Sequence, residues 1–155
     1  TRTNGEAGAE LLAEATAAYR AALRIRTEAE HPVEWAMTQN SLAIALANQG
    51  TRTNGEAGAE LLAEAIAAFR AALRIFTEAE HPMQWAETQE NMAITEQGIA
   101  KHDTTSNPRP HLNAALTHVD NALKIFDPTH MPYNHGTATT LRSKILAELA
   151  ALDEA

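Results

Sequence analysis

The stretch TRTNGEAGAELLAEA occurs twice in this chain, at residues 1–15 and again at residues 51–65. Extended from these two copies, residues 1–50 and 51–100 match at 35 of 50 positions without a gap. Residues 101–155 keep the same offset more faintly, with NALKI where each of the first two copies has AALRI. Three copies at one period indicate a repeat protein, in which each unit mainly contacts its neighbours.

The composition favours helices and narrows the class of protein. Of 155 residues, 33 are alanine, the best helix former, and aromatic residues make up only 5%. The absence of cysteine excludes disulfides, a thiol nucleophile and zinc sites with sulfur ligands. A formal charge of −8 argues against nucleic acid and against an anionic membrane surface as partners. No apolar run approaches the roughly 18 residues of a membrane span and the first ten residues do not read as a signal peptide, so we expect a cytoplasmic protein.

Each 50-residue unit reads as two helices. Apolar residues recur at steps of three and four, the helical period, and a proline at the start of the second helix marks a stop and a restart. Gly50 is expected to end the second helix of the first unit. The predicted helices span residues 8–27, 33–49, 58–78, 82–100, 110–127 and 133–152.

The motif carried by these helices is similar to that of the tetratricopeptide repeats. The residues that match are Leu42-Ala43, Leu46 and Gly50, followed by Ala65, Phe69 and Ala72. The usual unit has about 34 residues, so this chain resembles the elongated variants found in bacterial multi-repeat proteins and, more distantly, in kinesin light chains. The resemblance implies an all-α, right-handed α-solenoid of three antiparallel helix hairpins, forming one domain over residues 1–155 with repeats 1–50, 51–100 and 101–155.

The resemblance also implies a binding groove on the concave face, lined mostly by the first helix of each signature pair. The inward positions carried over to this chain are Met37, Asn40, Ile44, Ala47, Glu87, Glu90, Ile94, Gln97 and Lys144, with Thr137 and Thr140 beside the last of them. Glu87 and Glu90 stand where a clamp for a carboxylate needs positive charge. We therefore expect a basic or polar peptide as partner, with a merely solvated helix surface as the alternative.

Substitutions between the copies predict how two of the helices pack. One stripe of the first helix has Thr16 and Arg26 at its ends, where the second copy has Ile66 and Phe76. A terminal repeat needs a polar outer face, so we read this helix as an end cap, with random drift as the alternative. Leu46 is replaced by Glu96 in the second copy, and a buried glutamate is costly unless it finds water or a partner. We therefore expect the end of that helix to pack differently.

The last helix has a changed apolar pattern. His135 and Gly136 replace the Trp-Ala pair of the first two copies. The apolar stripe moves to the C-terminal part of the helix, where it consists of Leu141, Ile145, Leu146, Leu149 and Leu152. That distribution predicts a helix that caps the end of the stack, packed against the core on one side and exposed to solvent on the other.

The sequence has few residues or motifs that could indicate catalysis or metal binding. Five of the seven histidines lie in the last third of the chain, and His111 and His118 share a helix face seven residues apart. Asp120 or Asp127 could add a carboxylate, but metal ligands on one helix prefer a spacing of three to five, so a surface or capping role is favoured. The chain has no phosphate-binding glycine loop and no nucleophile elbow. We expect neither an enzyme, nor a cofactor, nor a metal site.

The sequence favours two function classes. The first is a protein–protein interaction scaffold that binds a partner peptide or domain on the concave face of the solenoid. The alternative is a homo-oligomeric structural module that assembles through its ends or by exchange of near-identical repeats, which is the raw material of domain swapping. A small-molecule or metal-binding helical domain comes third.

Overall fold

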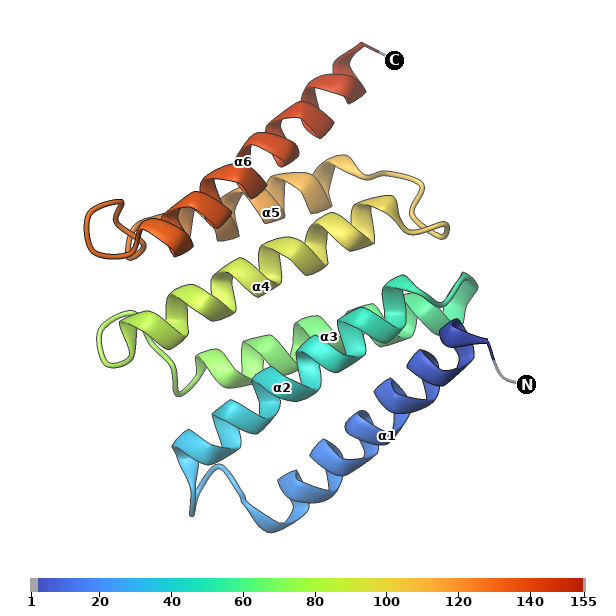
Figure 1. Cartoon of the computed structure of the whole chain (residues 1–155), viewed down its shortest axis with the longest axis vertical. Helices are drawn as coiled ribbons and strands as arrows, with labels where there is room; N and C mark the ends of the chain where they lie inside the picture. Colours follow the sequence, from blue (N-terminus) through green and yellow to red (C-terminus); the bar gives the residue numbers. More distant parts are fainter. Residues whose placement is uncertain (1–2, 155) are drawn as a thin grey trace. The chain divides into compact units, whose positions relative to one another are not determined.

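The structure, a computed structural model, describes residues 3–154. Over that range the chain forms six helices and no strand, which confirms the predicted all-α class (Figure 1). The helices are α1 (Asn4–Ile25), α2 (Pro32–Thr51), α3 (Gly55–Leu73), α4 (Pro82–Lys101), α5 (Arg109–Leu123) and α6 (Pro132–Asp153). Within the described residues, none of these helices combines the length and the hydropathy that crossing a bilayer requires.

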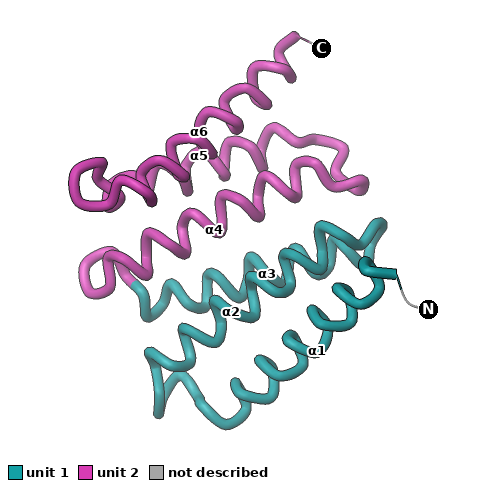
Figure 2. Tube along the Cα trace, viewed as in Figure 1, with its two compact units in different colours: residues 1–76 teal, residues 77–155 magenta. Residues whose placement is uncertain are grey.

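The chain divides into two compact units, which are described separately (Figure 2). Unit 1 holds α1, α2 and α3 and ends at Phe76, and unit 2 begins at Thr77 and holds α4, α5 and α6. In unit 1, α2 packs against both α1 and α3. In unit 2, α5 packs against both α4 and α6, while α4 and α6 touch each other only slightly.

The same turn leads into α2, α4 and α6. A side-chain oxygen of Thr27, Thr77 or Asp127 accepts a hydrogen bond from the backbone N–H three residues later, at 3.3, 3.2 and 2.7 Å respectively. Each turn is followed by a proline that occupies the first position of the helix. Proline suits this position because its ring presets φ and its missing N–H would have had no partner there. The same local chemistry thus precedes the second helix of each 50-residue copy.

The core of unit 1 lies between α2 and its two neighbours. Leu42 and Leu46 of α2 and Ala65 of α3 form one buried cluster, against which Tyr19 and Leu23 of α1 pack. A second cluster consists of Trp35, Ala36, Ala72 and Phe76. The guanidinium carbon of Arg74 lies 5.1 Å from the Trp35 ring centroid and the same group forms a 2.8 Å ion pair with Glu28.

The core of unit 2 joins all three of its helices. Its fully buried members are Ala86, Ala93, Ala115, Val119, Ala122, Phe126, Ala138 and Ile145. Leu141 and Leu149 of α6 pack against this cluster, as expected of the shifted apolar stripe, whereas Leu146 is 40% exposed. The last helix is therefore covered along one side, and its stripe is narrower than the sequence suggested.

Gly50 does not end its helix, contrary to expectation. α2 continues to Thr51, and Gly50 is buried inside it. A Cβ atom at this position would lie 2.7 Å from Cγ of Leu62 and 3.1 Å from the carbonyl oxygen of Gly58. Glycine is needed here because α2 and α3 approach each other closely, since any larger residue would push Leu62 out of place.

Thr16 does not belong to a polar outer face, so that part of the cap interpretation is wrong. Its side chain is buried, with 4% exposed, and its hydroxyl has no hydrogen-bond partner among the described residues. Arg26, at the other end of the stripe, is exposed as expected. The threonine therefore takes a core position that Ile66 fills in the second copy.

The end of α4 packs differently from the end of α2, as expected, and Glu96 is buried there with a partner. The residue as a whole is 7% exposed, and its Oε2 accepts a 2.8 Å hydrogen bond from Nδ1 of His111 on α5. Fifty residues earlier, these two positions are Leu46 and Leu61, both packed in one cluster. An apolar contact between α2 and α3 is thus replaced by a hydrogen bond between a histidine and a glutamate of α5 and α4, and His111 is an interface residue rather than a surface or capping one.

Candidate functional site

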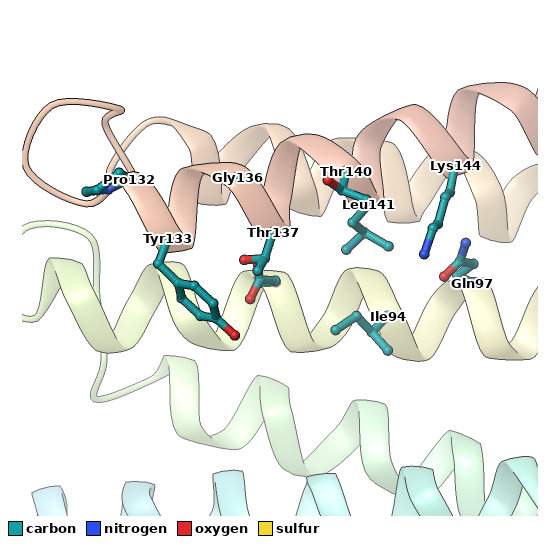
Figure 3. A pocket seen from close by; sticks show the side chains of 10 residues that line it. Ile94, Gln97, Pro132, Tyr133, Gly136, Thr137, Thr140, Leu141 and Lys144 are labelled. Atoms are coloured by element: carbon teal, nitrogen blue, oxygen red, sulfur yellow. The ribbon is translucent and has the colours of Figure 1, made fainter.

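Unit 2 contains a groove of about 720 Å³ between α4 and α6 (Figure 3). Its walls are turns of two helices, and α5 packs against both of them. The residues that line it are Glu90, Ile94 and Gln97 of α4, and Pro132, Tyr133, Gly136, Thr137, Thr140, Leu141 and Lys144 of α6.

Helical spacing explains why these residues meet. The three α4 residues follow one another at steps of four and three, and the α6 residues recur at the same steps from Tyr133 to Lys144. Residues three and four apart lie on one face of a helix. Each helix therefore presents one longitudinal stripe to the groove, and the polar and apolar members of the stripes are sorted along its length.

One end of the groove is acidic and aromatic. Glu90 lies half-buried on α4, and the hydroxyl of Thr137 donates a 3.3 Å hydrogen bond to its Oε2. Burial raises the pKa of Glu90 above its ordinary value, the hydrogen bond from Thr137 opposes that shift, and the negative charge of Glu87 adds to it. Tyr133 lies at the same end with 79% of its surface exposed, and its ring extends from α6 toward α4 (Figure 3).

The middle of the groove is apolar. Ile94 on α4 is 50% exposed, and Leu141 of α6 lies across from it (Figure 3). Gly136 leaves additional room, because a Cβ atom there would meet no other atom within 4 Å. A solvent-exposed isoleucine in a concave site is the kind of surface that an apolar side chain of a ligand covers.

The far end of the groove is positive. Gln97 donates a 2.7 Å hydrogen bond to Oε1 of Glu148, and the same carboxylate forms a 3.0 Å ion pair with Lys101. Lys144 is exposed and lies beside Gln97 (Figure 3). Among residues 3–154 it has no ion-pair partner, so its ammonium group is available to an anionic group of a ligand.

The structure brings together four of the nine predicted groove residues, namely Glu90, Ile94, Gln97 and Lys144, and also Thr137 and Thr140. Glu87 does not line the groove but is exposed on α4, one turn before Glu90, where it acts on the pKa of that residue.

The other four predicted residues lie on α2 in unit 1 and do not line this groove. Met37 and Ile44 are exposed, and Asn40 is half-buried. Met37 borders a small hollow of about 190 Å³ next to Tyr19 of α1. Ala47 packs against the cluster formed by Leu42, Leu46 and Ala65, so it belongs to the core of unit 1.

Sequence reasoning missed Pro132, Tyr133, Gly136 and Leu141 as groove residues. Tyr133 had a signal, because it lies four, seven and eleven residues before the predicted positions Thr137, Thr140 and Lys144. Gly136 had none, since its counterparts Ala36 and Ala86 are fully buried.

Three histidines of the last third, His111, His118 and His130, make hydrogen bonds with neighbouring side chains. His111 donates to Glu96, and Nδ1 of His118 donates a 2.7 Å hydrogen bond to Oε1 of the buried Gln89. His130 pairs with Asp127 in the turn before α6. In the part of the chain that the structure describes, no group of three or more His, Asp or Glu side chains is placed to hold a metal ion.

Comparison of the chain with protein-family models, with curated proteins and with solved structures finds no match to any of them. The resemblance to the tetratricopeptide repeats therefore rests on the sequence motif and its 50-residue period.

Proposed function

We propose that this chain is a protein–protein interaction module of the tetratricopeptide-repeat type and that the α4–α6 groove binds a peptide segment of a partner protein. The observation that carries the proposal is the groove itself, in which an exposed isoleucine lies between an acidic, aromatic end and a free ammonium group. Apolar surface with a few convergent polar groups is typical of ligand sites. The module binds its partner and catalyses no reaction.

The proposal includes a right-handed solenoid of stacked hairpins. Two observations support it. The sequence repeats at a fixed period of 50 residues. In addition, the contact of α2 with α3 in unit 1 recurs as the contact of α4 with α5 in unit 2, at equivalent positions. Recurring contacts between successive copies are the basis of solenoid stacking.

The partner segment is proposed to be mixed in charge. At the acidic end, the carboxylates of Glu87 and Glu90 and the exposed ring of Tyr133 favour a lysine or arginine side chain, through charge attraction and a cation–π contact. An apolar side chain covers Ile94 and Leu141. At the far end, Lys144 favours a carboxylate.

The length of the groove sets the spacing of these groups. Glu90 and Gln97 are seven residues apart on α4, which corresponds to roughly 10.5 Å along the helix axis. An extended chain covers about 3.3 Å per residue. A basic residue and an acidic residue three positions apart, with an apolar residue between them, therefore match the two ends of the groove.

A peptide-display selection on the immobilised protein tests the proposal, with Ile94→Asp and Ile44→Asp as a matched pair of variants. Both isoleucines are exposed and occupy equivalent positions in the first two copies, but only Ile94 lines the groove. We expect enrichment of the basic–apolar–acidic pattern, with binding lost in Ile94→Asp and retained in Ile44→Asp. Equal loss in both variants, or no enrichment of any pattern, would contradict the proposal.

A further inference from the structure

We infer that the pair formed by Glu96 and His111 determines which helices of the repeat can pack on one another, so that α4 accepts the face of α5 and rejects the similar face of α3. Neither residue lines the α4–α6 groove, so the inference goes beyond the function proposed above. It concerns two contacts that occupy equivalent positions of the repeat, namely α2 with α3 in unit 1 and α4 with α5 in unit 2.

Much of the buried surface is the same in the two contacts. Their helices bury alanine, with 0% of each residue exposed, at Ala36, Ala43, Ala65 and Ala72 and at the equivalent Ala86, Ala93, Ala115 and Ala122. Small side chains let helices approach closely, but a methyl group does not distinguish one apolar partner from another. A helix that fits one of these faces by shape therefore comes close to fitting the other.

The two contacts differ in polarity at one buried position on each helix. Leu46 of α2, with 0% exposed, and Leu61 of α3 belong to one apolar cluster. Fifty residues later, Glu96 is 7% exposed and accepts a 2.8 Å hydrogen bond from Nδ1 of His111. The carboxylate that α4 carries thus has a donor on α5, whereas α3 offers only leucine at the equivalent position.

The second hydrogen bond across the α4–α5 contact does not separate the two contacts. Oε1 of Gln89 accepts it from Nδ1 of His118 at 2.7 Å. The residue of α2 equivalent to Gln89 is also a glutamine, Gln39, so either helix could offer this acceptor to α5. The selectivity is therefore assigned to Glu96 and His111.

Packing of a helix of the α4 type on α3 would meet two obstacles. The Glu96 carboxylate would lie buried against Leu61 without a donor, and burial of an unpaired carboxylate is costly. In addition, α4 has Ala100 where α2 has Gly50. A Cβ atom at position 50 would lie 2.7 Å from Cγ of Leu62, so the methyl group of Ala100 would crowd that leucine.

Packing of a helix of the α2 type on α5 would be disfavoured less strongly. Leu46 would then face His111, whose ring N–H would lose its acceptor. The imidazole side chain is 38% exposed, so water can replace part of the lost hydrogen bond. The rejection is therefore stronger for α4 on α3 than for α2 on α5.

Such selectivity matters in a chain built from similar copies. A helix can pack on the wrong copy, in its own molecule or in a second one, and misassembly of this kind is a characteristic failure of repeat proteins. A polar pair buried among apolar residues can specify which helices associate, at some cost in stability. Glu96 and His111 hold that position at the contact of α4 with α5.

Urea unfolding of the full chain, followed by circular dichroism, tests whether the pair specifies its partner in either unit. Leu46→Glu places the α4 residue against α3 and should raise the ratio of unfolded to folded protein at least about tenfold. Adding Leu61→His should reverse that effect. If Leu46→Glu alone does not fold, recovery of folding in the double variant is the readout.

A matched pair of variants separates selectivity from composition. Leu46→Glu/Leu61→His/Glu96→Leu/His111→Leu exchanges the two pairs between the units and should be about as stable as the parent. Leu61→His/His111→Leu has the same four residue types as the parent but mismatches both contacts, so it should unfold at a lower urea concentration than the exchanged variant.

Refolding at high protein concentration tests the effect on assembly. Glu96→Leu/His111→Leu gives both contacts the leucine pair, so α2 can pack on either face. After dilution from urea, light scattering coupled to gel filtration should show a smaller monomer fraction for this variant than for the parent. The inference is overturned if Leu61→His does not rescue Leu46→Glu, if the mismatched variant is as stable as the exchanged one, or if the leucine variant refolds to monomer as completely as the parent.

Discussion

Nδ1 of His111 lies 2.8 Å from Oε2 of Glu96, at the two positions where the preceding copy has Leu61 and Leu46. The carboxylate side chain is 9% exposed, and the imidazole is 38% exposed. The two leucines of the earlier pair are thus replaced by a glutamate and a histidine that contact each other. The histidine supplies the hydrogen-bond donor that the buried glutamate requires. A hydrogen bond of this kind contributes little net stability, but removal of the histidine is expensive because the buried carboxylate loses its donor.

Replacement of His111 by leucine tests this coupling. We expect His111→Leu to destabilise the protein by about 2–3 kcal/mol, because the Glu96 carboxylate stays buried without its donor. The double variant Glu96→Leu/His111→Leu rebuilds the leucine pair of unit 1 and should be at least as stable as the parent. Urea unfolding followed by circular dichroism measures both. If the single and the double variant unfold at the same urea concentration, the pair does not act as a unit.

Two glycines in helices should respond in opposite directions to alanine. Gly50→Ala forces a methyl group against Leu62 and should destabilise the protein by about 1–3 kcal/mol, since tightly packed sites resist added volume. Gly136→Ala adds its methyl group to open space and should stabilise the protein by about 1 kcal/mol through helix propensity. Thermal unfolding of the two variants side by side checks the contrast, and destabilisation by Gly136→Ala would show that the groove is narrower than described.

The buried hydroxyl of Thr16 should be a source of instability. Thr16→Val keeps the shape and removes an oxygen atom that has no partner among the described residues, so we expect stabilisation by about 1–2 kcal/mol. Thr88→Val is the matched control, because Thr88 is also buried but its hydroxyl donates a 2.7 Å hydrogen bond to the carbonyl of Gln84. The control should gain nothing. Equal responses in chemical denaturation would mean that the Thr16 hydroxyl does find a partner.

Glu90 should give the protein a distinctive dependence on pH. Its pKa is raised by burial and by the charge of Glu87, so the unfolded state loses this proton at a lower pH than the folded state does. The contribution of Glu90 to stability therefore falls as pH rises from its ordinary pKa to its raised one, and stays low at neutral pH. Glu90→Gln should remove this fall and make the protein more stable at neutral pH.

Carbon-13 NMR titration of the Glu90 carboxyl measures the same effect directly. Glu87→Gln should lower the pKa of Glu90 toward its ordinary value, because it removes a like charge, whereas Glu34→Gln on α2 should leave it unchanged. An unaltered Glu90 titration in Glu87→Gln would show that burial alone sets the shift.

The helices could be predicted from the sequence because their signals are local. Apolar residues at the helical period and a proline at the start of three helices fix where each element begins, within a few residues. The pairing of Glu96 with His111 could not be read in the same way. A comparison of copies identifies Glu96 as a costly change. The partner that satisfies its carboxylate depends on which residue of α5 lies opposite, and that is set by the packing of α4 against α5.

The groove was predictable in part for a similar reason. Glu90, Ile94 and Lys144 follow from helical spacing once one position is known. Tyr133 lies in the first turn of α6, one helical turn before Thr137, the first position on that helix that the resemblance suggested, so only an extension of the helical spacing would have found it. Gly50 illustrates the opposite error, because a glycine near the end of a helix looks the same in sequence whether it stops the helix or lets a neighbour approach.

The close crossing of Gly50 with Leu62 has a consequence for how such a chain can lengthen. The segment that follows Gly50 begins with the same fifteen residues as the segment that starts at Thr1. A tandem duplication of residues 1–50, inserted at this junction, would therefore join an α2-type end to an α3-type beginning once more and would require no new interface. Each further duplication would add one helix hairpin, and the number of hairpins would depend on the number of copies alone.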